Sequence, residues 1–180
     1  SKPNPGGGPD GDVPVHVSFL IDRSGSMQGL VEDVVGGFNA FLSTQKSETG
    51  DCTMTLVQFD SQNPFEVVHD ATPINQVPDL TRDRYQPRGA TPLLDALGDL
   101  VTSVDRRLAG LGTPEDQIVV VFSDGLENAS RRWTRPALFE YAPAPESRSI
   151  VDIAPSYGLF IDGEFVDGHG ILILPTTGRY

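Results

Sequence analysis

The chain of 180 residues is long enough for one good hydrophobic core and short for two full domains. It carries 25 acidic and 13 basic residues, and the formal net charge of −12 argues against nucleic acid or an anionic membrane as a partner. The single cysteine, Cys52, excludes an intrachain disulfide framework. No apolar run has the length of a transmembrane helix and no signal peptide is visible, which favours a cytoplasmic protein without membrane insertion. A cell-surface or secreted protein stays open, because a chain that begins at Ser1 can have lost its native start.

The first predicted elements are a leader and a strand. Residues 1–14 are rich in glycine and proline, and we expect a flexible leader there. The apolar run at residues 15–21 predicts a strand. The next five residues, DRSGS at 22–26, place three oxygen donors at the carboxyl end of that strand: Asp22, Ser24 and Ser26. Such donors suit a hard divalent cation such as Mg²⁺, and the simpler alternative is a serine-rich turn whose aspartate caps the following helix.

The middle of the chain predicts a helix and two strands. Residues 28–46 carry apolar side chains along one helical face, which is typical of a helix packed against a sheet. Residues 52–59 predict the next strand, and residues 65–69 predict its partner across a turn. The polar stretch at residues 75–88 then leads to a second helix.

Two further segments carry candidate metal-binding residues. Thr91 precedes a run whose apolar residues recur at intervals of three and four as far as Leu108, which predicts a helix with Pro92 in its first turn. The apolar run at residues 118–122 predicts a strand buried on both faces, and it leads to Asp124. The simpler alternatives are that Thr91 is a helix N-cap and that Asp124 ends an ordinary turn. Taken together, all the donors stand at strand ends or helix starts, where an open α/β sheet binds its ligands.

Strands that alternate with helices predict an α/β fold. We expect a Rossmann-like, doubly wound and mostly parallel sheet, flanked by helices in three layers, with room for one antiparallel edge strand. The C-terminal part predicts an irregular hairpin.

Three stretches of sequence, LIDRSGSM, GATPLLDAL and VVFSDG, resemble von Willebrand factor type A (VWA) domains that carry a metal-ion-dependent adhesion site (MIDAS). The similarity covers about residues 15–140 and is greatest to the compact bacterial branch of the family. The MIDAS of that family consists of a DxSxS motif, a distant threonine and a distant aspartate. The matching positions in this chain are Asp22, Ser24, Ser26, Thr91 and Asp124.

The resemblance implies a division of labour among these five residues. The serine and threonine hydroxyls would reach the metal, and the two aspartates would act directly or through bound water. The expected metal is Mg²⁺, with Mn²⁺ or Ca²⁺ as alternatives. The expected partner is a protein that presents an aspartate or glutamate to the metal. The oligomeric state is left open.

We expect no enzymatic activity from this chain. Its three histidines, His16, His69 and His169, stand far apart, and the sequence has no nucleotide-binding loop or nucleophile elbow. The favoured function is metal-dependent capture of a partner protein. The alternative is a structural or regulatory module whose metal site takes no part in recognition, fused or not to an aldehyde dehydrogenase-like protein.

The last part of the chain, residues 141–180, is predicted to be a C-terminal extension that either completes the domain or derives from a fusion or frameshift. A helix predicted from residue 133 is stopped by the sequence APAP. Residues 142–169 are similar to the amino-terminal segment of aldehyde dehydrogenases, without the catalytic Cys or Glu of that family. The sequence LPTTG at 174–178 fits a sortase pattern, and we interpret it as a coincidence because no apolar span follows. Residues 171–174 are instead a candidate late strand.

Overall fold

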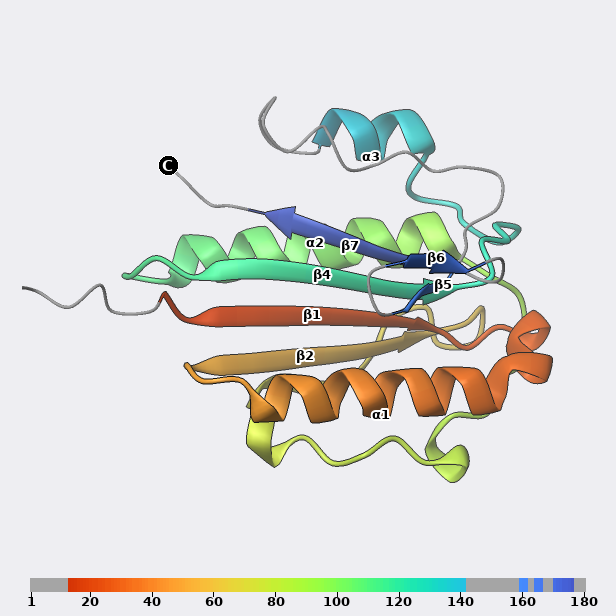
Figure 1. Cartoon of the computed structure of the whole chain (residues 1–180). Coiled ribbons are helices and arrows are strands. Elements are labelled where there is room, and N and C mark those ends of the chain that lie inside the picture. Colours follow the sequence, from red (N-terminus) through yellow and green to blue (C-terminus); the bar gives the residue numbers. More distant parts are fainter. Residues whose placement is uncertain (1–12, 142–158, 162–163, 167–169, 177–180) are drawn as a thin grey trace, which may run out of the picture.

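The computed structural model of the chain describes residues 13–141, 159–161, 164–166 and 170–176 (Figure 1). Most of the predicted leader, most of the aldehyde dehydrogenase-like stretch and the end of the LPTTG sequence lie outside these residues. Over the described part of the chain, no helix has both the length and the apolar character needed to cross a membrane.

The centre of the fold is an open, mixed sheet of five strands in the order β3-β2-β1-β4-β7. Strand β1 (Val15–Asp22) lies in the middle, between β2 (Cys52–Phe59) and β4 (Asp116–Ser123), and it is parallel to both. Each edge strand is antiparallel to its neighbour: β3 (Glu66–Pro73) pairs with β2, and β7 (Gly170–Thr176) pairs with β4. The expected sheet had room for one antiparallel edge, and the structure has two.

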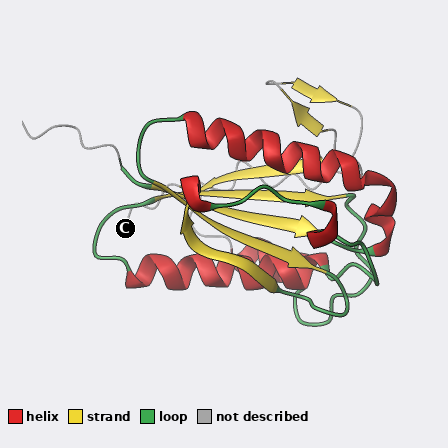
Figure 2. Cartoon of the chain, turned by 90° about the horizontal axis from the view of Figure 1, so that it is seen from below, coloured by secondary structure: helices red, strands yellow, loops and turns green. Residues whose placement is uncertain are grey.

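Two long helices cover the sheet, α1 (Val31–Ser47) and α2 (Leu93–Gly110) (Figure 2). They lie on opposite faces because the side chains of β1 alternate between two hydrophobic clusters. Phe19 of β1 packs in the cluster of α1, and the next residue, Leu20, packs in the cluster of α2. The predicted α/β class is confirmed.

The remaining described elements are short. The 3₁₀ helices are η1 (Gly25–Leu30), η2 (Ile74–Gln76) and η3 (Arg82–Arg84). A third α-helix and a small separate sheet follow: α3 (Arg135–Tyr141), β5 (Leu159–Ile161) and β6 (Glu164–Val166). The antiparallel pairing of β5 with β6 confirms the predicted hairpin strands, while the turn between them lies outside the described residues. The candidate late strand at residues 171–174 lies within β7.

The start of α1 differs from its prediction. The helix predicted over residues 28–46 begins as η1, and regular α-helix starts only at Val31. The glycines at positions 25 and 29 weaken α-helical propensity there, and the tighter 3₁₀ turn brings the chain directly out of the DRSGS loop.

The core of the α1 side contains a group of packed aromatic rings. Phe19 contacts Phe38 of α1 edge to face, with ring centroids 5.0 Å apart, and stacks on Phe122 of β4 at 5.3 Å. Phe19 and Phe38 are fully buried. Because such rings remove large apolar areas from water, they fix α1 on the sheet and so fix the loop that enters α1.

Candidate metal centre

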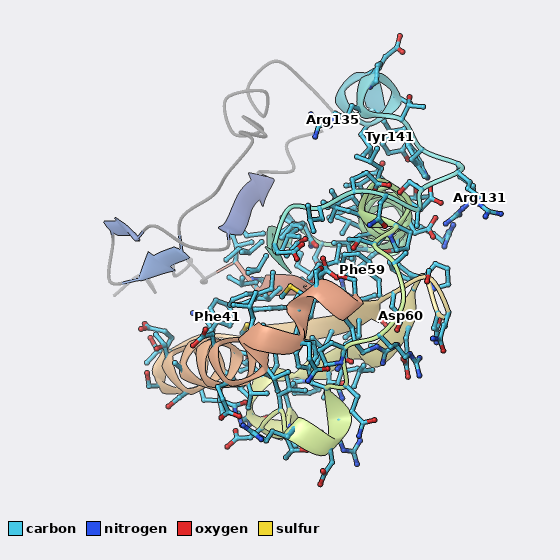
Figure 3. The ribbon with its side chains drawn as sticks, turned by 90° about the vertical axis from the view of Figure 1, so that its right-hand side faces the viewer. Phe41, Phe59, Asp60, Arg131, Arg135 and Tyr141 are labelled. Carbon is cyan, nitrogen blue, oxygen red and sulfur yellow. The ribbon has the colours of Figure 1, made fainter. Side chains whose placement is uncertain are left out.

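The predicted site residues lie at the carboxyl end of the parallel strands. Asp22 is the last residue of β1, and Asp124 follows the last residue of the neighbouring strand β4. The two strands run in parallel register, with Ile21 opposite Phe122, so Asp22 lies opposite Ser123, and Asp124 follows one residue farther along, near enough for its charge to act on Asp22. Figure 3 looks onto this end of the molecule, toward which the arrows of the parallel strands β1, β2 and β4 point in Figure 1.

The carboxylate of Asp22 is buried and held from two sides. Its Oδ1 accepts a hydrogen bond from the backbone N–H of Ser24 at 2.7 Å, and its Oδ2 accepts one from the Ser123 hydroxyl at 2.7 Å. Burial raises the pKa of Asp22 to about 6; the hydrogen bonds from Ser123 and Ser24 oppose this shift, and nearby Asp124 adds to it. A negative charge at this position is therefore costly unless a cation joins it.

The two serines of the DRSGS loop face one another. The hydroxyl oxygens of Ser24 and Ser26 lie 3.1 Å apart, with Ser24 buried and Ser26 exposed. Gly25 between them donates its N–H to the carbonyl of Gly89 at 2.9 Å. A Cβ at Gly25 would come within 3.2 Å of that carbonyl oxygen, so glycine allows this close approach. The contact joins the loop to the segment that carries Thr91.

Thr91 is buried and bonded through its backbone to the loop after β4. Its N–H donates to the side-chain carbonyl of Asn128 at 2.8 Å, and the N–H of Asn128 donates to the Thr91 carbonyl at 3.1 Å. Helix α2 starts at Leu93 with Pro92 in the N-cap position and no side-chain cap. The simpler interpretation of Thr91 as an N-cap is therefore wrong, as is the expectation that Pro92 lies inside the first turn.

Asp22 does not cap a helix either. The residue at the N-cap of η1 is Ser24, the residue at the N-cap of α1 is Leu30, and neither helix has a side-chain cap hydrogen bond. The capping alternative for the DRSGS aspartate is thus wrong.

A buried ionic network, which we call the Arg23 network, joins the loops next to the site. The Arg23 guanidinium is buried; its Nε donates to Asp60 Oδ2 at 2.8 Å, and its Nη1 donates to Gln58 Oε1 at 3.1 Å. Its Nη2 pairs with Glu66 at 2.6 Å, and Arg88 Nε also donates to Asp60 Oδ2, at 3.0 Å. These contacts join the loops after β1 and β2 to the loop before Thr91.

The charge of Asp60 is used within this network. Burial acts to raise the pKa of Asp60, but hydrogen bonds from the Asn63 N–H, from Arg23 and from other donors outweigh it and lower the pKa below its usual value. Asp60 is thus an ionised anchor of the loops. Sequence reasoning missed it, because its partner stands 37 residues away and the DRSGS motif treats Arg23 as a spacer.

Two further carboxylates lock the loop after Asp124 onto the start of α2. Glu127 accepts the N–H of Leu94 at 2.9 Å. The buried carboxylate of Asp95 accepts the N–H groups of three consecutive residues at 2.8 to 2.9 Å: Arg131, Arg132 and Trp133. Sequence reasoning assigned no role to either acid; the one available signal was an acidic residue in the first turn of a predicted helix.

The five predicted residues thus stand at one edge of the fold, and the contacts that link them differ in kind. Asp22, Ser24 and Ser26 are linked by hydrogen bonds, Asp124 acts electrostatically on Asp22, and Thr91 is joined through backbone contacts of its segment. Two carboxylates with neutral hydroxyls fit a small hard cation. Among the described residues, no group of three or more His, Cys, Asp or Glu side chains gathers in a metal-binding arrangement. Neither a family model nor a curated protein matches the chain.

Proposed function

We propose that the chain is a VWA-type binding module with a Rossmann-like, doubly wound core of three layers. Its MIDAS would hold Mg²⁺, with Mn²⁺ or Ca²⁺ as alternatives, and would capture an aspartate or glutamate of a partner protein. The proposed ligands are Asp22, Ser24, Ser26, Thr91 and Asp124. The observation that supports this most is the buried Asp22 carboxylate beside two hydroxyl oxygens 3.1 Å apart.

The electrostatics of the site favour a cation. No salt bridge within the described part of the chain joins Asp22 or Asp124 to a lysine or arginine. Each oxygen of the Asp22 carboxylate already accepts one hydrogen bond, so the carboxylate is oriented before a ligand arrives. A bound divalent cation would supply the missing positive charge and a coordination position at which a partner's carboxylate replaces water.

The surroundings of the site favour binding over catalysis. Tyr85 donates its hydroxyl to the Asp22 carbonyl at 2.6 Å. Burial, and then the charges of Asp22 and Asp124, raise the pKa of Tyr85 far above its usual value, so it is a neutral donor and a poor base. A carboxylate can bind at such a centre without any bond being made or broken, and we therefore propose a non-enzymatic module.

A thermal-melt titration with Mg²⁺ and with Mn²⁺ tests this proposal on three proteins: wild type, Asp124→Ala and Asp116→Ala. Asp116 is the matched control, because it is exposed and lies at the opposite end of the same strand β4. A cation that binds only the native state raises the melting temperature as its concentration passes its dissociation constant. We expect a saturable rise in wild type and in the Asp116 variant, and none in the Asp124 variant.

The same experiment can contradict the proposal. Equal rises in all three proteins would mean that the ions bind elsewhere on an acidic surface. If the melting temperature rose in none of them, the five residues would not bind these metals, and the structural-module alternative would be favoured. Circular dichroism of Asp124→Ala without metal checks that the variant is folded, which we expect because its side chain is only half-buried.

A further inference from the structure

Nearly half of the basic residues of this acidic chain stand in two short stretches, which lie close in the sequence to Thr91 and to Asp124. The chain has a net charge of −12, yet six of its 13 basic residues stand in two short stretches, residues 82–88 and 131–135. They are Arg82, Arg84, Arg88, Arg131, Arg132 and Arg135. We call these two stretches the arginine rim.

Hydrogen bonds join one residue of each stretch to the segments around the centre. The first leads directly to Thr91, and the N–H of Arg88 donates to the Arg23 carbonyl at 2.8 Å. The second follows Asp124, and the N–H of Arg131 donates to Asp95 in the first turn of α2 at 2.9 Å. In Figure 3 the labelled Arg131 projects outward from its loop at this end of the molecule. Arg88 and Arg131 are thus tied to segments next to the candidate ligands, Arg88 to the loop of Asp22 and Arg131 to the start of α2.

Half of the rim is already paired within the chain. Arg82 pairs with Glu32, Arg88 with Asp60, and Arg132 with Asp99. The other three arginines are exposed and form no salt bridge with described residues: Arg84, Arg131 and Arg135. The salt bridges of the paired arginines fall within the chain, whereas the unpaired ones leave positive charge exposed on the surface.

We propose, resting on the metal-dependent function above, that the partner offers an acidic segment with several carboxylates. One carboxylate binds at the metal centre, and its neighbours pair with Arg84 and Arg131, one from each stretch of the rim. The net charge of the chain is strongly negative and repels such a segment, so the positive rim would attract it and orient its approach. A site that bound only one carboxylate at the metal could not distinguish partners by the acidic residues that flank this carboxylate.

Two labelled peptides of equal length test this inference. Both contain one central Asp, which is flanked by Glu in the first peptide and by Gln in the second. Fluorescence anisotropy in saturating Mg²⁺ gives their affinities for wild type, for the double variant Arg84→Gln/Arg131→Gln and for Arg106→Gln. Arg106 is the matched control: it is an exposed arginine on α2, about 20 Å along the helix from the end that adjoins the centre.

At low salt we expect the Glu-flanked peptide to bind wild type about tenfold more tightly than the Gln-flanked one, because two exposed ion pairs are added. The double variant should lose most of this advantage while its affinity for the Gln-flanked peptide is unchanged. The Arg106 variant should keep the advantage. About 0.5 M salt should abolish it in wild type, since exposed pairs are strongly screened there.

Several outcomes would overturn the inference. Equal affinities of the two peptides for wild type would show that the rim does not bind the flanking carboxylates. An equal loss of affinity for the Glu-flanked peptide in the Arg106 variant would show the same. Binding of the Glu-flanked peptide that survives chelation of the metal, or is matched by a single-stranded oligonucleotide of equal charge, would assign the rim to another ligand. Failure of the proposed function itself is distinguishable, because Mg²⁺ would then fail to raise the melting temperature of wild type.

Discussion

The two ends of the central strand β1 each bury a titratable side chain, and the charges that surround the two side chains differ. At the amino end, His16 is buried and its Nδ1 lies 2.7 Å from the Thr53 hydroxyl. The nearby charges of Arg107 and Glu115 form a salt bridge of 2.7 Å with each other. At the carboxyl end, Asp22 has no such balanced surroundings, since Asp124 adds charge of the same sign.

We call the amino end of the sheet, where the buried group is neutral, the closed end. We call the carboxyl end, where the buried Asp22 carboxylate forms no salt bridge with described residues, the open end. Burial, followed by the charge of Arg107, lowers the pKa of His16 to about 4, so the side chain is neutral at physiological pH and needs no ion. Burial raises the pKa of Asp22 to about 6, so the ionised carboxylate that prevails at neutral pH is costly at this position. The chain therefore satisfies the buried group at its amino end by itself, whereas under the function proposed above a bound cation would complete the carboxyl end.

The largest effect is expected at the carboxyl end, from the substitution Asp60→Ala, which removes the ionised partner of Arg23. The variant leaves the buried guanidinium of Arg23 without its main partner, and we expect a loss of about 3–5 kcal/mol in the free energy of unfolding. Urea unfolding followed by circular dichroism measures it. Asp79→Ala, at an exposed position, should change the same quantity by less than about 0.5 kcal/mol. Similar small changes in both variants would mean that the Arg23 network contributes little.

The pH dependence of stability sharpens the comparison at the amino end. Because the pKa of His16 is lowered on folding, the unfolded chain takes up a proton first as the pH falls below 6.5, and stability is lost down to about pH 4. We expect wild type to lose about 2 kcal/mol more than His16→Gln between pH 7.5 and pH 5. Urea unfolding at the two pH values gives this difference.

Comparison of the two proteins isolates His16 from the other end of the strand. Asp22 acts in the opposite direction, since its raised pKa favours the folded state as the pH falls, but it contributes equally to both proteins. Three charged groups act on His16 and are unchanged by the substitution: Arg107, Glu115 and Asp70. Parallel pH profiles for wild type and variant would contradict a neutral buried histidine.

The sequence was informative where a pattern is local. The strand predicted over residues 52–59 has the bounds of β2, because its β-branched and apolar residues favour an extended chain. The donors of the DRSGS loop were likewise predictable, since their spacing lies within five residues. The position of Asp124 beside Asp22 followed from the rule that parallel strands end together at one edge.

What the sequence left out depends on contacts between distant residues. The pairing of Arg23 with Asp60, or of Asp95 with the N–H groups of residues 131–133, spans 36 to 38 positions and has no periodic signal. The second antiparallel edge, β7, was only one of two interpretations of the tail, because four apolar residues do not specify a partner or a direction. The parts that hold the site in place were therefore less visible than the site's own donors.

The last prediction separates metal binding from folding at the open end. Ser26 is exposed, and its hydroxyl contacts that of Ser24, so Ser26→Ala should change the free energy of unfolding by less than about 0.5 kcal/mol without metal. Loss of one oxygen donor should nonetheless weaken Mg²⁺ binding about tenfold or more, as titration calorimetry would measure. The control Ser43→Ala, an exposed serine on α1, should leave the affinity unchanged. An unchanged affinity in the Ser26 variant would remove this hydroxyl from the ligand set, whereas a selective loss would mean that the open end is built for a cation and not for stability.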